Sequence, residues 1–173
     1  MRPTVNIFLI GFMGSGKSWT GRRLADRLGW PFVDLDEAVE ARAGKTISEI
    51  FATEGEVVFR RLEHEELLAA AAHPAPRVIA TGGGAPCFHD GIDRMLENGI
   101  VCFLDPPVAT LIARLTDERA HRPLLQDDAA LRELIETRLA ARRPVYERAH
   151  FIITDLGPLL AALSADVAPD GEG

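Results

Sequence analysis

The sequence predicts an α/β fold in which a five-stranded, mostly parallel sheet carries helices on both faces. Two observations lead to this class: short apolar segments recur along the chain, and segments with helical patterning separate them. Strands that alternate with helices pair in parallel, because each helix returns the chain across a face of the sheet. A length of 173 residues with 47% apolar residues suits one domain of this kind.

The first predicted strand, at residues 5–10, is apolar along almost its whole length, as is typical of a strand buried on both faces. Similar short segments mark the other four strands. They lie at residues 32–34, 78–80, 100–104 and 151–154.

The predicted helices have apolar residues at helical spacing, and several are followed by Gly or Pro. Thr46, with Glu49 three residues later, resembles a capping box. Pro144 is expected to end the helix that precedes it. The helices lie at residues 19–28, 36–43, 54–72, 92–97, 108–115, 129–143 and 158–163.

Composition limits where the protein works and what it binds. The longest apolar run is interrupted by Asn6 and Gly11, and it is far shorter than the roughly 18–20 residues of a membrane span. No small-residue cleavage site of the signal-peptide type follows it. Cys87 and Cys102 are typical of free thiols in a reducing cytosol, so we expect a cytoplasmic protein with no membrane partner. A net charge of −7 argues against nucleic-acid binding and requires positive charge to gather locally wherever anions are handled.

The segment GFMGSGKS at residues 11–18 matches the phosphate-binding loop pattern, with a strand before it and a helix after it. Glycines let backbone N–H groups turn toward phosphate oxygens, and the following helix directs its positive dipole end at the same anion. Lys17 is expected to reach the β and γ phosphates, and Ser18 offers a hydroxyl to Mg²⁺. Trp19 is expected to pack on the sheet. The predicted ATP-binding positions at this loop are Gly14, Ser15, Gly16, Lys17, Ser18 and Trp19.

Two carboxylates follow the second strand, at Asp34 and Asp36. Ligands of open α/β sheets bind at the carboxyl ends of the strands, so both belong at the edge that carries the phosphate loop. Asp34 could hold magnesium, and Asp36 could orient or deprotonate an acceptor hydroxyl. The alternative is that one of them caps the next helix.

Arginines and glycines complete the candidate site. Arg60 could bind an anion or lie on a solvated face paired with neighbouring glutamates. The triple glycine at residues 82–84 could let a substrate or phosphate approach bare backbone, or it could be a flexible hinge. Arg114 could flank the adenine, and Arg142 ends a helix, which is unremarkable by itself. Arg122 falls in a polar stretch at residues 116–128, which is expected to be a mobile lid that closes over the γ phosphate and excludes water.

Together these motifs resemble the shikimate kinase family, small phosphate-loop kinases similar to the nucleoside-monophosphate kinases. The resemblance covers roughly residues 5–146. The motifs that carry it are GFMGSGKS at 11–18, DLD at 34–36, IFATEGEVVFRRLE at 50–63, TGGG at 81–84, RPLL at 122–125 and RRPVY at 142–146.

The resemblance implies transfer of the γ phosphate of ATP to the 3-hydroxyl of shikimate, giving 3-phosphoshikimate and ADP in aromatic amino-acid biosynthesis. It implies that Asp36 binds the ring hydroxyls and orients the attacking one, and that Arg60 and Arg142 bind the carboxylate. The catalytic residues would be Lys17, Asp36 and Arg122, and the backbone at Gly82, Gly83 and Gly84 would contact shikimate.

The resemblance also implies that Ser18 and Asp34 hold Mg²⁺ and that Arg114 and Arg122 contact ATP. A single kinase domain would span residues 1–164, with a helical substrate-binding segment at about 36–66 and the lid at about 116–128, followed by a disordered tail at 165–173. The protein would be a monomer. Trp19 departs from the small residue often found after the loop serine.

Two other hypotheses stay open at this point. A kinase for another small acceptor, such as gluconate, could also use carboxylate-binding arginines. A non-catalytic nucleotide-binding module would be favoured by loss of Lys17, Asp36 or Arg122, and all three are present.

Overall fold

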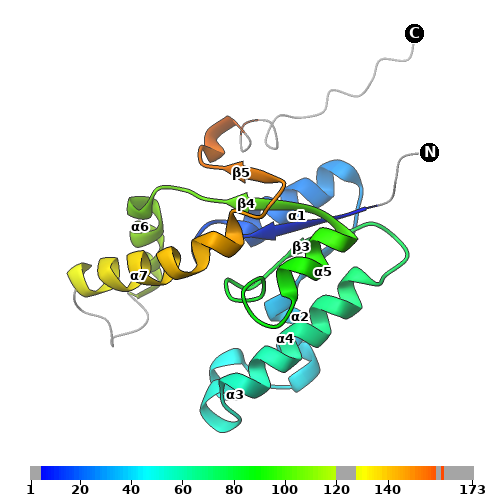
Figure 1. Cartoon of the computed structure of the whole chain (residues 1–173), viewed down its shortest axis with the longest axis horizontal. Coiled ribbons are helices and arrows are strands. Elements are labelled where there is room, and N and C mark those ends of the chain that lie inside the picture. Colours follow the sequence, from blue (N-terminus) through cyan, green and yellow to red (C-terminus); the bar gives the residue numbers. More distant parts are fainter. Residues whose placement is uncertain (1–4, 120–127, 159–160, 162–173) are drawn as a thin grey trace.

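A five-stranded parallel sheet forms the centre of the protein (Figure 1). The computed structural model describes residues 5–119, 128–158 and 161. Every pair of neighbouring strands is parallel, and Leu9 lies opposite Ala80 on one side and Cys102 on the other. The order in space is β2 (Phe32–Asp34), β3 (Val78–Ala80), β1 (Asn6–Ile10), β4 (Gly99–Leu104) and β5 (Phe151–Ile153). The predicted sheet is confirmed.

Helices cover both faces of this sheet. Successive residues of each strand point to opposite faces, and in β1 apolar side chains on both faces pack against helices. Phe8 and Ile10 belong to a large core cluster with residues of α4, α5, α6 and α7, whereas Leu9 packs with Ala25 of α1 on the other face. The helices are α1 (Lys17–Leu28), α2 (Leu35–Ala43), α3 (Ile47–Thr53), α4 (Glu56–Ala71), α5 (Gly91–Asn98), α6 (Val108–Arg119) and α7 (Asp128–Tyr146).

Between β2 and β3 the chain leaves the sheet and builds a lobe from α2, α3 and the N-terminal part of α4 (Figure 1). Gly44 ends α2 in the left-handed conformation, at φ 64°. The predicted capping box then starts α3: the Thr46 side chain accepts from the N–H of Glu49 at 3.2 Å, and the Glu49 carboxylate accepts from the N–H of Thr46 at 2.7 Å. A small core of Val39, Ile50 and Phe59 holds the lobe together.

Two helices, α6 and α7, continue well past their predicted C-terminal ends. Helix α6 continues to Arg119, so the first residues of the expected lid are helical, and residues 120–127 lie outside the described chain. Helix α7 continues through Pro144 to Tyr146, so the expectation that Pro144 ends the helix is wrong. Proline removes one N–H from the helical ladder, but the turn around it is anchored: Tyr146 is fully buried, and Arg143 makes two hydrogen bonds with Asp105, at 2.7 and 3.1 Å.

Most of the predicted last helix at 158–163 and all of the predicted tail at 165–173 lie outside the described residues. Among the helices of the described chain, none combines the length and the apolar character needed to cross a membrane.

Candidate active site

The phosphate loop joins β1 to α1 as the sequence predicts. Gly14 and Gly16 have φ of 79° and 94°, in the left-handed region that only glycine enters without strain. Ser15 is fully buried between them, and its N–H donates to the carbonyl of Phe12 at 3.1 Å. The glycines of the motif are therefore needed by the backbone of the loop itself.

Lys17 folds back over this loop. Its Nζ donates to the carbonyl of Gly11 at 2.7 Å and to that of Phe12 at 2.9 Å. Burial lowers the pKa of Lys17 to about 8, and the nearby carboxylates of Asp36 and Asp34 oppose the shift. The side chain is thus held beside the loop as a cation that ligand charge can stabilise further.

Asp34 caps the next helix, which is one of the two roles considered for it, and it also contacts Ser18. Its Oδ1 accepts from the N–H groups of Asp36 at 3.0 Å and Glu37 at 3.3 Å, which caps α2. Its Oδ2 accepts from the hydroxyl of Ser18 at 2.6 Å. These two hard oxygen ligands suit Mg²⁺, which is often bound by one or two carboxylates together with phosphates and water. Within the described residues, no group of three or more His, Cys, Asp or Glu side chains is arranged to hold a metal ion.

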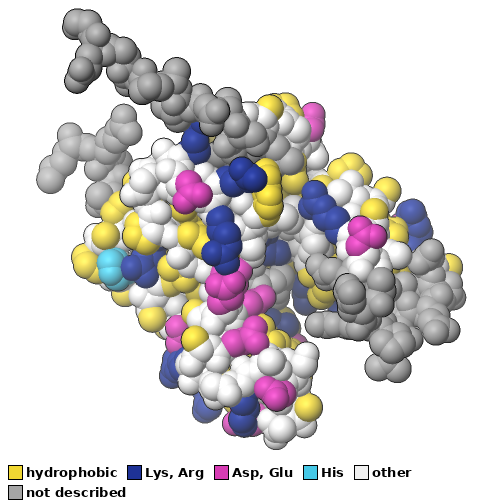
Figure 2. Space-filling model, turned by 180° about the vertical axis from the view of Figure 1, so that it is seen from behind, with side chains coloured by type: hydrophobic (Ala, Val, Ile, Leu, Met, Phe, Trp, Pro, Cys, Tyr) yellow, Lys and Arg dark blue, Asp and Glu magenta, His cyan; other side chains and the backbone are white. Residues whose placement is uncertain are grey.

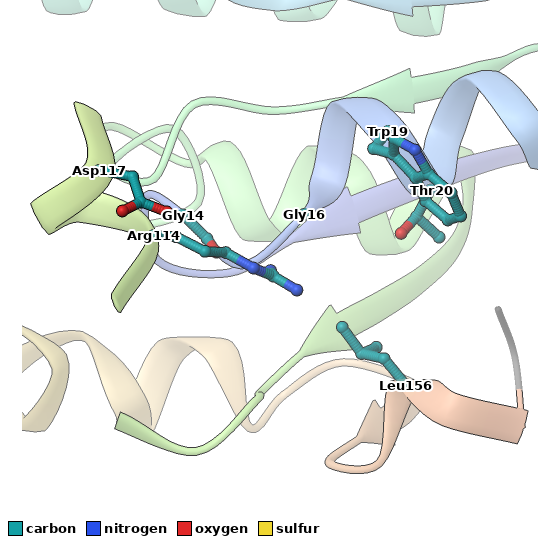
Figure 3. A pocket seen from close by; sticks show the side chains of 7 residues that line it. All are labelled: Gly14, Gly16, Trp19, Thr20, Arg114, Asp117 and Leu156. Carbon is teal, nitrogen blue, oxygen red and sulfur yellow. The ribbon is translucent and has the colours of Figure 1, made fainter. Parts of the chain in front are cut away.

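A pocket of about 490 Å³ opens beside the phosphate loop (Figure 3). Arg114 of α6 reaches across the loop, and its Nη1 donates to the carbonyl of Gly14 at 2.8 Å. Leu156 and Trp19 border the same space (Figure 3). The expectation that Trp19 packs on the sheet is wrong: its side chain is 45% exposed, and the guanidinium of Arg23 lies 4.1 Å from the centre of its ring.

A second pocket, of about 470 Å³, lies between α4 and α7 at the carboxyl edge of the sheet. Seen from behind, the molecule is hollowed between the α2–α4 lobe and the part that carries α6 and α7 (Figure 2). The six predicted substrate-binding residues come from four segments of the chain and all line this pocket. They are Asp36, Arg60, Gly82, Gly83, Gly84 and Arg142.

Arg60 is both paired and part of this pocket. Its Nη1 donates to Glu63 at 2.8 Å and its Nε to Glu56 at 3.3 Å. The side chain is only 11% exposed, so it does not lie on a solvated face. Among the described residues, Nη2 of Arg60 has no hydrogen-bond partner, and this nitrogen is free for an anion.

The pKa of Asp36 is raised, first by burial and then by the negative charge of Asp34, while Lys17 and Arg60 act in the opposite direction. A carboxylate with a raised pKa holds a proton more readily than an exposed one. Asp36 is therefore suited to accept a proton from a hydroxyl group in the pocket.

The triple glycine makes room for charged side chains. A β-carbon at Gly82 would lie 2.7 Å from Glu63 Oε2 and 2.9 Å from Asp36 Oδ1. At Gly83 it would lie 3.1 Å from Nη1 of Arg142, and at Gly84 it would overlap the Arg60 guanidinium. The absence of a β-carbon thus lets these side chains approach the backbone of the loop. This role for the three glycines differs from both predicted ones, the approach of a substrate to bare backbone and a flexible hinge.

Glu63 and Tyr146 bear on the pocket between α4 and α7, and neither was predicted to do so. Glu63 is 2% exposed and lines the pocket, and burial is the main cause that raises its pKa. The signal was its place on a buried helical stripe between Phe59 and Leu67, where an acidic residue is unexpected. Tyr146 donates from its hydroxyl to the carbonyl of Gly83 at 2.5 Å, a contact between distant segments that no local pattern indicates.

Arg122 lies outside the described residues, so its place relative to the site stays a prediction. Apart from Arg122 and the fully buried Ser15, the predicted site residues border three adjoining pockets at one edge of the sheet.

A family model for shikimate kinase matches residues 13–162. The chain belongs to the shikimate kinase family. Shikimate kinase from Symbiobacterium thermophilum is 48% identical over 146 residues, which cover 84% of this chain and 83% of the relative. Shikimate kinase from Salinibacter ruber is 44% identical over 155 residues, which cover 84% of this chain and 74% of the relative.

Solved shikimate kinases share the fold. The structure from Bacteroides thetaiotaomicron matches with a TM-score of 0.83 at 38% identity, covering 92% of this chain and 94% of that one. Shikimate kinase from Acinetobacter baumannii in complex with shikimate matches with a TM-score of 0.79 at 38% identity, covering 94% and 90%. The family confirms the predicted shikimate kinase activity, with use of ATP, over both alternatives, a gluconate kinase and a non-catalytic module.

Proposed function

We propose that this shikimate kinase binds ATP over the phosphate loop and shikimate in the pocket between α4 and α7, and that the two substrates meet at Asp36. One observation carries the proposal. Asp36, Gly82 and Gly83 line the α4–α7 pocket and also a pocket of about 330 Å³ around Lys17 and Ser18. A γ phosphate above Lys17 and a hydroxyl beside Asp36 would therefore be neighbours.

In this proposal the 3-hydroxyl oxygen of shikimate attacks the γ phosphorus in line with the leaving ADP oxygen, and its proton passes to the Asp36 carboxylate. The raised pKa of Asp36 favours this acceptance. Lys17 and the backbone N–H groups of the loop stabilise the negative charge on the transferred phosphoryl group. The protein thus acts by positioning and by charge stabilisation.

Arg60 and Arg142 would bind the carboxylate of shikimate, because a planar guanidinium fork matches a planar carboxylate. The unpartnered Nη2 of Arg60 and the place of both arginines in one pocket support this role. The related enzyme from Acinetobacter baumannii, solved in complex with shikimate, adds support for an acceptor site in this fold.

Ser18 and Asp34 would hold Mg²⁺, as their paired oxygens support. The ion would supply positive charge to the β and γ phosphates. Arg114 and Trp19 would border the nucleotide on its base side, and Arg122 would reach the γ phosphate from the lid. Of these groups, Arg114 already contacts the phosphate loop at Gly14.

We further place the enzyme in the cytoplasm, where its two free cysteines, Cys87 and Cys102, stay reduced. We also propose that it works as a monomer. Light scattering after gel filtration should then give a mass near 18.9 kDa, and a dimer mass would contradict this.

The substrate and the role of Asp36 can be tested together in a coupled assay of ADP release with Mg²⁺ and ATP. Turnover should depend on shikimate and not on gluconate. Asp36→Asn should lower kcat by about a hundredfold or more, with ATP affinity unchanged in a calorimetric titration. Glu37→Gln is the matched control, because this neighbouring carboxylate is exposed and pairs with Arg22. Equal turnover of Asp36→Asn and the wild type would remove Asp36 from the mechanism.

A further inference from the structure

The loop between β3 and α5 holds α4 through three consecutive residues. Cζ of Arg60 lies 4.0 Å from the centre of the Phe88 ring. His89 packs against His64, with ring centres 5.0 Å apart, and Oδ1 of Asp90 lies 3.0 Å from Nε2 of His64. Arg60 and His64 are four residues apart in α4 and so lie on one face of it. The three loop residues therefore pack against the face of α4 that carries Arg60.

The Arg60 guanidinium contacts two kinds of group, carboxylates that offset its charge and an aromatic ring that does not. Glu63 and Glu56 take the hydrogen bonds of Nη1 and Nε, and the backbone of Gly84 lies close against the group. The ring face of Phe88 attracts a cation without neutralising it and without using an N–H group. Phe88 thus fixes the guanidinium while Nη2 stays available for a ligand.

The backbone of the loop is strained at His89. Its φ is 52°, and within the described chain it is the one residue other than glycine with a positive φ. A side-chain-bearing residue keeps such a conformation where its surroundings over-determine it, often near a functional site. Here the surroundings are the contact with His64 and the link from Asp90 to the same histidine, directly after Phe88.

We propose that Phe88 is a positioning residue for the acceptor: it orients the Arg60 guanidinium toward a carboxylate, and His89 and Asp90 fix the loop that presents it. This inference rests on the proposed role of Arg60 in binding the carboxylate of shikimate. Phe88 itself is not among the residues that line the pocket between α4 and α7, but it contacts Arg60, which does, so we expect its effect to pass through Arg60.

The test compares variants of the whole chain in the ADP-release assay. Phe88→Leu keeps an apolar side chain but removes the ring face, whereas Phe88→Tyr keeps the face. Phe88→Leu should raise the KM for shikimate about three- to tenfold, with kcat and the KM for ATP within about twofold of the wild type. Phe88→Tyr should keep the KM for shikimate at the wild-type value. Phe151→Leu, at an exposed aromatic residue of β5, is the matched control.

A double-mutant cycle then asks whether Phe88 acts through Arg60. In an Arg60→Ala background, adding Phe88→Leu should leave kcat/KM for shikimate, taken from initial slopes, unchanged. A further drop of the same size as in the wild type would overturn the proposal, as would equal losses for shikimate and ATP. Phe88→Met serves as a second variant if the leucine protein unfolds. If Arg60→Ala alone leaves kcat/KM for shikimate unchanged, the proposed role of Arg60 fails, and this inference with it.

Discussion

At the scale of single residues, glycines 82–84 show how a missing side chain can define a site. None of the three has a positive φ, so the backbone does not require glycine there. What requires it is the close approach of Asp36, Arg142 and Arg60 to the loop. The functional side chains and the loop are therefore fitted to each other at a separation that a β-carbon would prevent.

Gly84→Ala should displace the Arg60 guanidinium, because the new β-carbon would lie 2.6 Å from its Cζ and Nη2. A flexible side chain can move aside, so the protein should fold while the KM for shikimate rises by about tenfold or more. The KM for ATP should stay the same. Steady-state kinetics with each substrate varied in turn would measure this.

Gly29→Ala is the control, since this glycine has nothing within 4 Å of a new β-carbon and a φ of 64°. That change should cost stability by up to about 1 kcal/mol and leave both KM values unchanged. A shikimate KM that responds equally to the two substitutions would contradict the explanation.

The residues predicted from the sequence and those missed differ in how far their partners lie along the chain. Lys17 and Ser18 were predictable because the loop that needs them is continuous. Asp36 was predictable because the end of a parallel strand fixes the edge at which it lies. Glu63 was visible only as a possible partner of Arg60, because its role depends on which face of α4 is buried.

At the scale of elements, α7 closes one side of the pocket between α4 and α7 and contacts the glycine loop, residues 82–84. Tyr146, the fully buried last residue of α7, donates from its hydroxyl to the carbonyl of Gly83. Its ring packs on Phe103, with ring centres 4.9 Å apart. Burial raises the pKa of Tyr146 to about 12, so the phenol stays protonated and keeps its donor. The helix end is therefore tied to the backbone at the site.

Tyr146→Phe should test this tie. The ring packing is kept and one hydrogen bond is lost, so the free energy of unfolding should fall by about 1 kcal/mol. The glycine loop loses its anchor, so the KM for shikimate should rise more than the KM for ATP. Urea denaturation gives the first quantity and steady-state kinetics the second. Unchanged stability would mean that water replaces the phenol at the Gly83 carbonyl without cost.

The same helix shows why its end was mispredicted. Pro144 is a local signal that correctly marks the loss of one N–H. The contacts that outweigh it, from Arg143 to Asp105 and from Tyr146 to Gly83, join residues far apart in sequence. The end of α7 is thus set by tertiary contacts, whereas the pattern alone predicted the order of the strands and of the helices other than α3, for which it marked only the capping box at Thr46 and Glu49.

At the scale of the whole molecule, a net charge of −7 contrasts with the cations that line the pockets at the carboxyl edge of the sheet, Lys17, Arg60 and Arg142 among them. Lys17 is the one that titrates in an accessible range, because burial lowers its pKa from 10.5 to about 8. Between these values the unfolded chain binds more protons than the folded one, so the stability of the free enzyme should rise as pH increases from about 8 toward 10. Below the folded pKa, burial of the charged lysine costs stability in full.

Binding of ATP should reverse this shift, because phosphate charge raises the pKa of Lys17 again. At about pH 8.5, above the lowered pKa of Lys17, much of the free enzyme would carry this lysine neutral, so ATP binding should take up a proton. The uptake should be much smaller at about pH 7. Calorimetric titrations in two buffers of different ionisation enthalpy would measure it.

The chain offers a matched control, because its other lysine, Lys45, lies on the surface beside Glu54. Lys45→Met should keep the proton uptake and Lys17→Met should abolish it. Uptake of equal size in both variants would assign the proton to another group.

The excursion of the chain between β2 and β3 has a consequence for how such an enzyme can change. Asp36, Arg60 and Glu63 all belong to this one excursion, whereas the phosphate loop and Arg114 lie outside it. Part of the acceptor pocket can therefore be altered within a single continuous insertion while the phosphate loop is left as it is, and the rest of that pocket comes from Gly82–Gly84 and Arg142. For evolution, and for an engineer who wishes to phosphorylate another hydroxy acid, this insertion is the first segment to vary, with Asp36 kept.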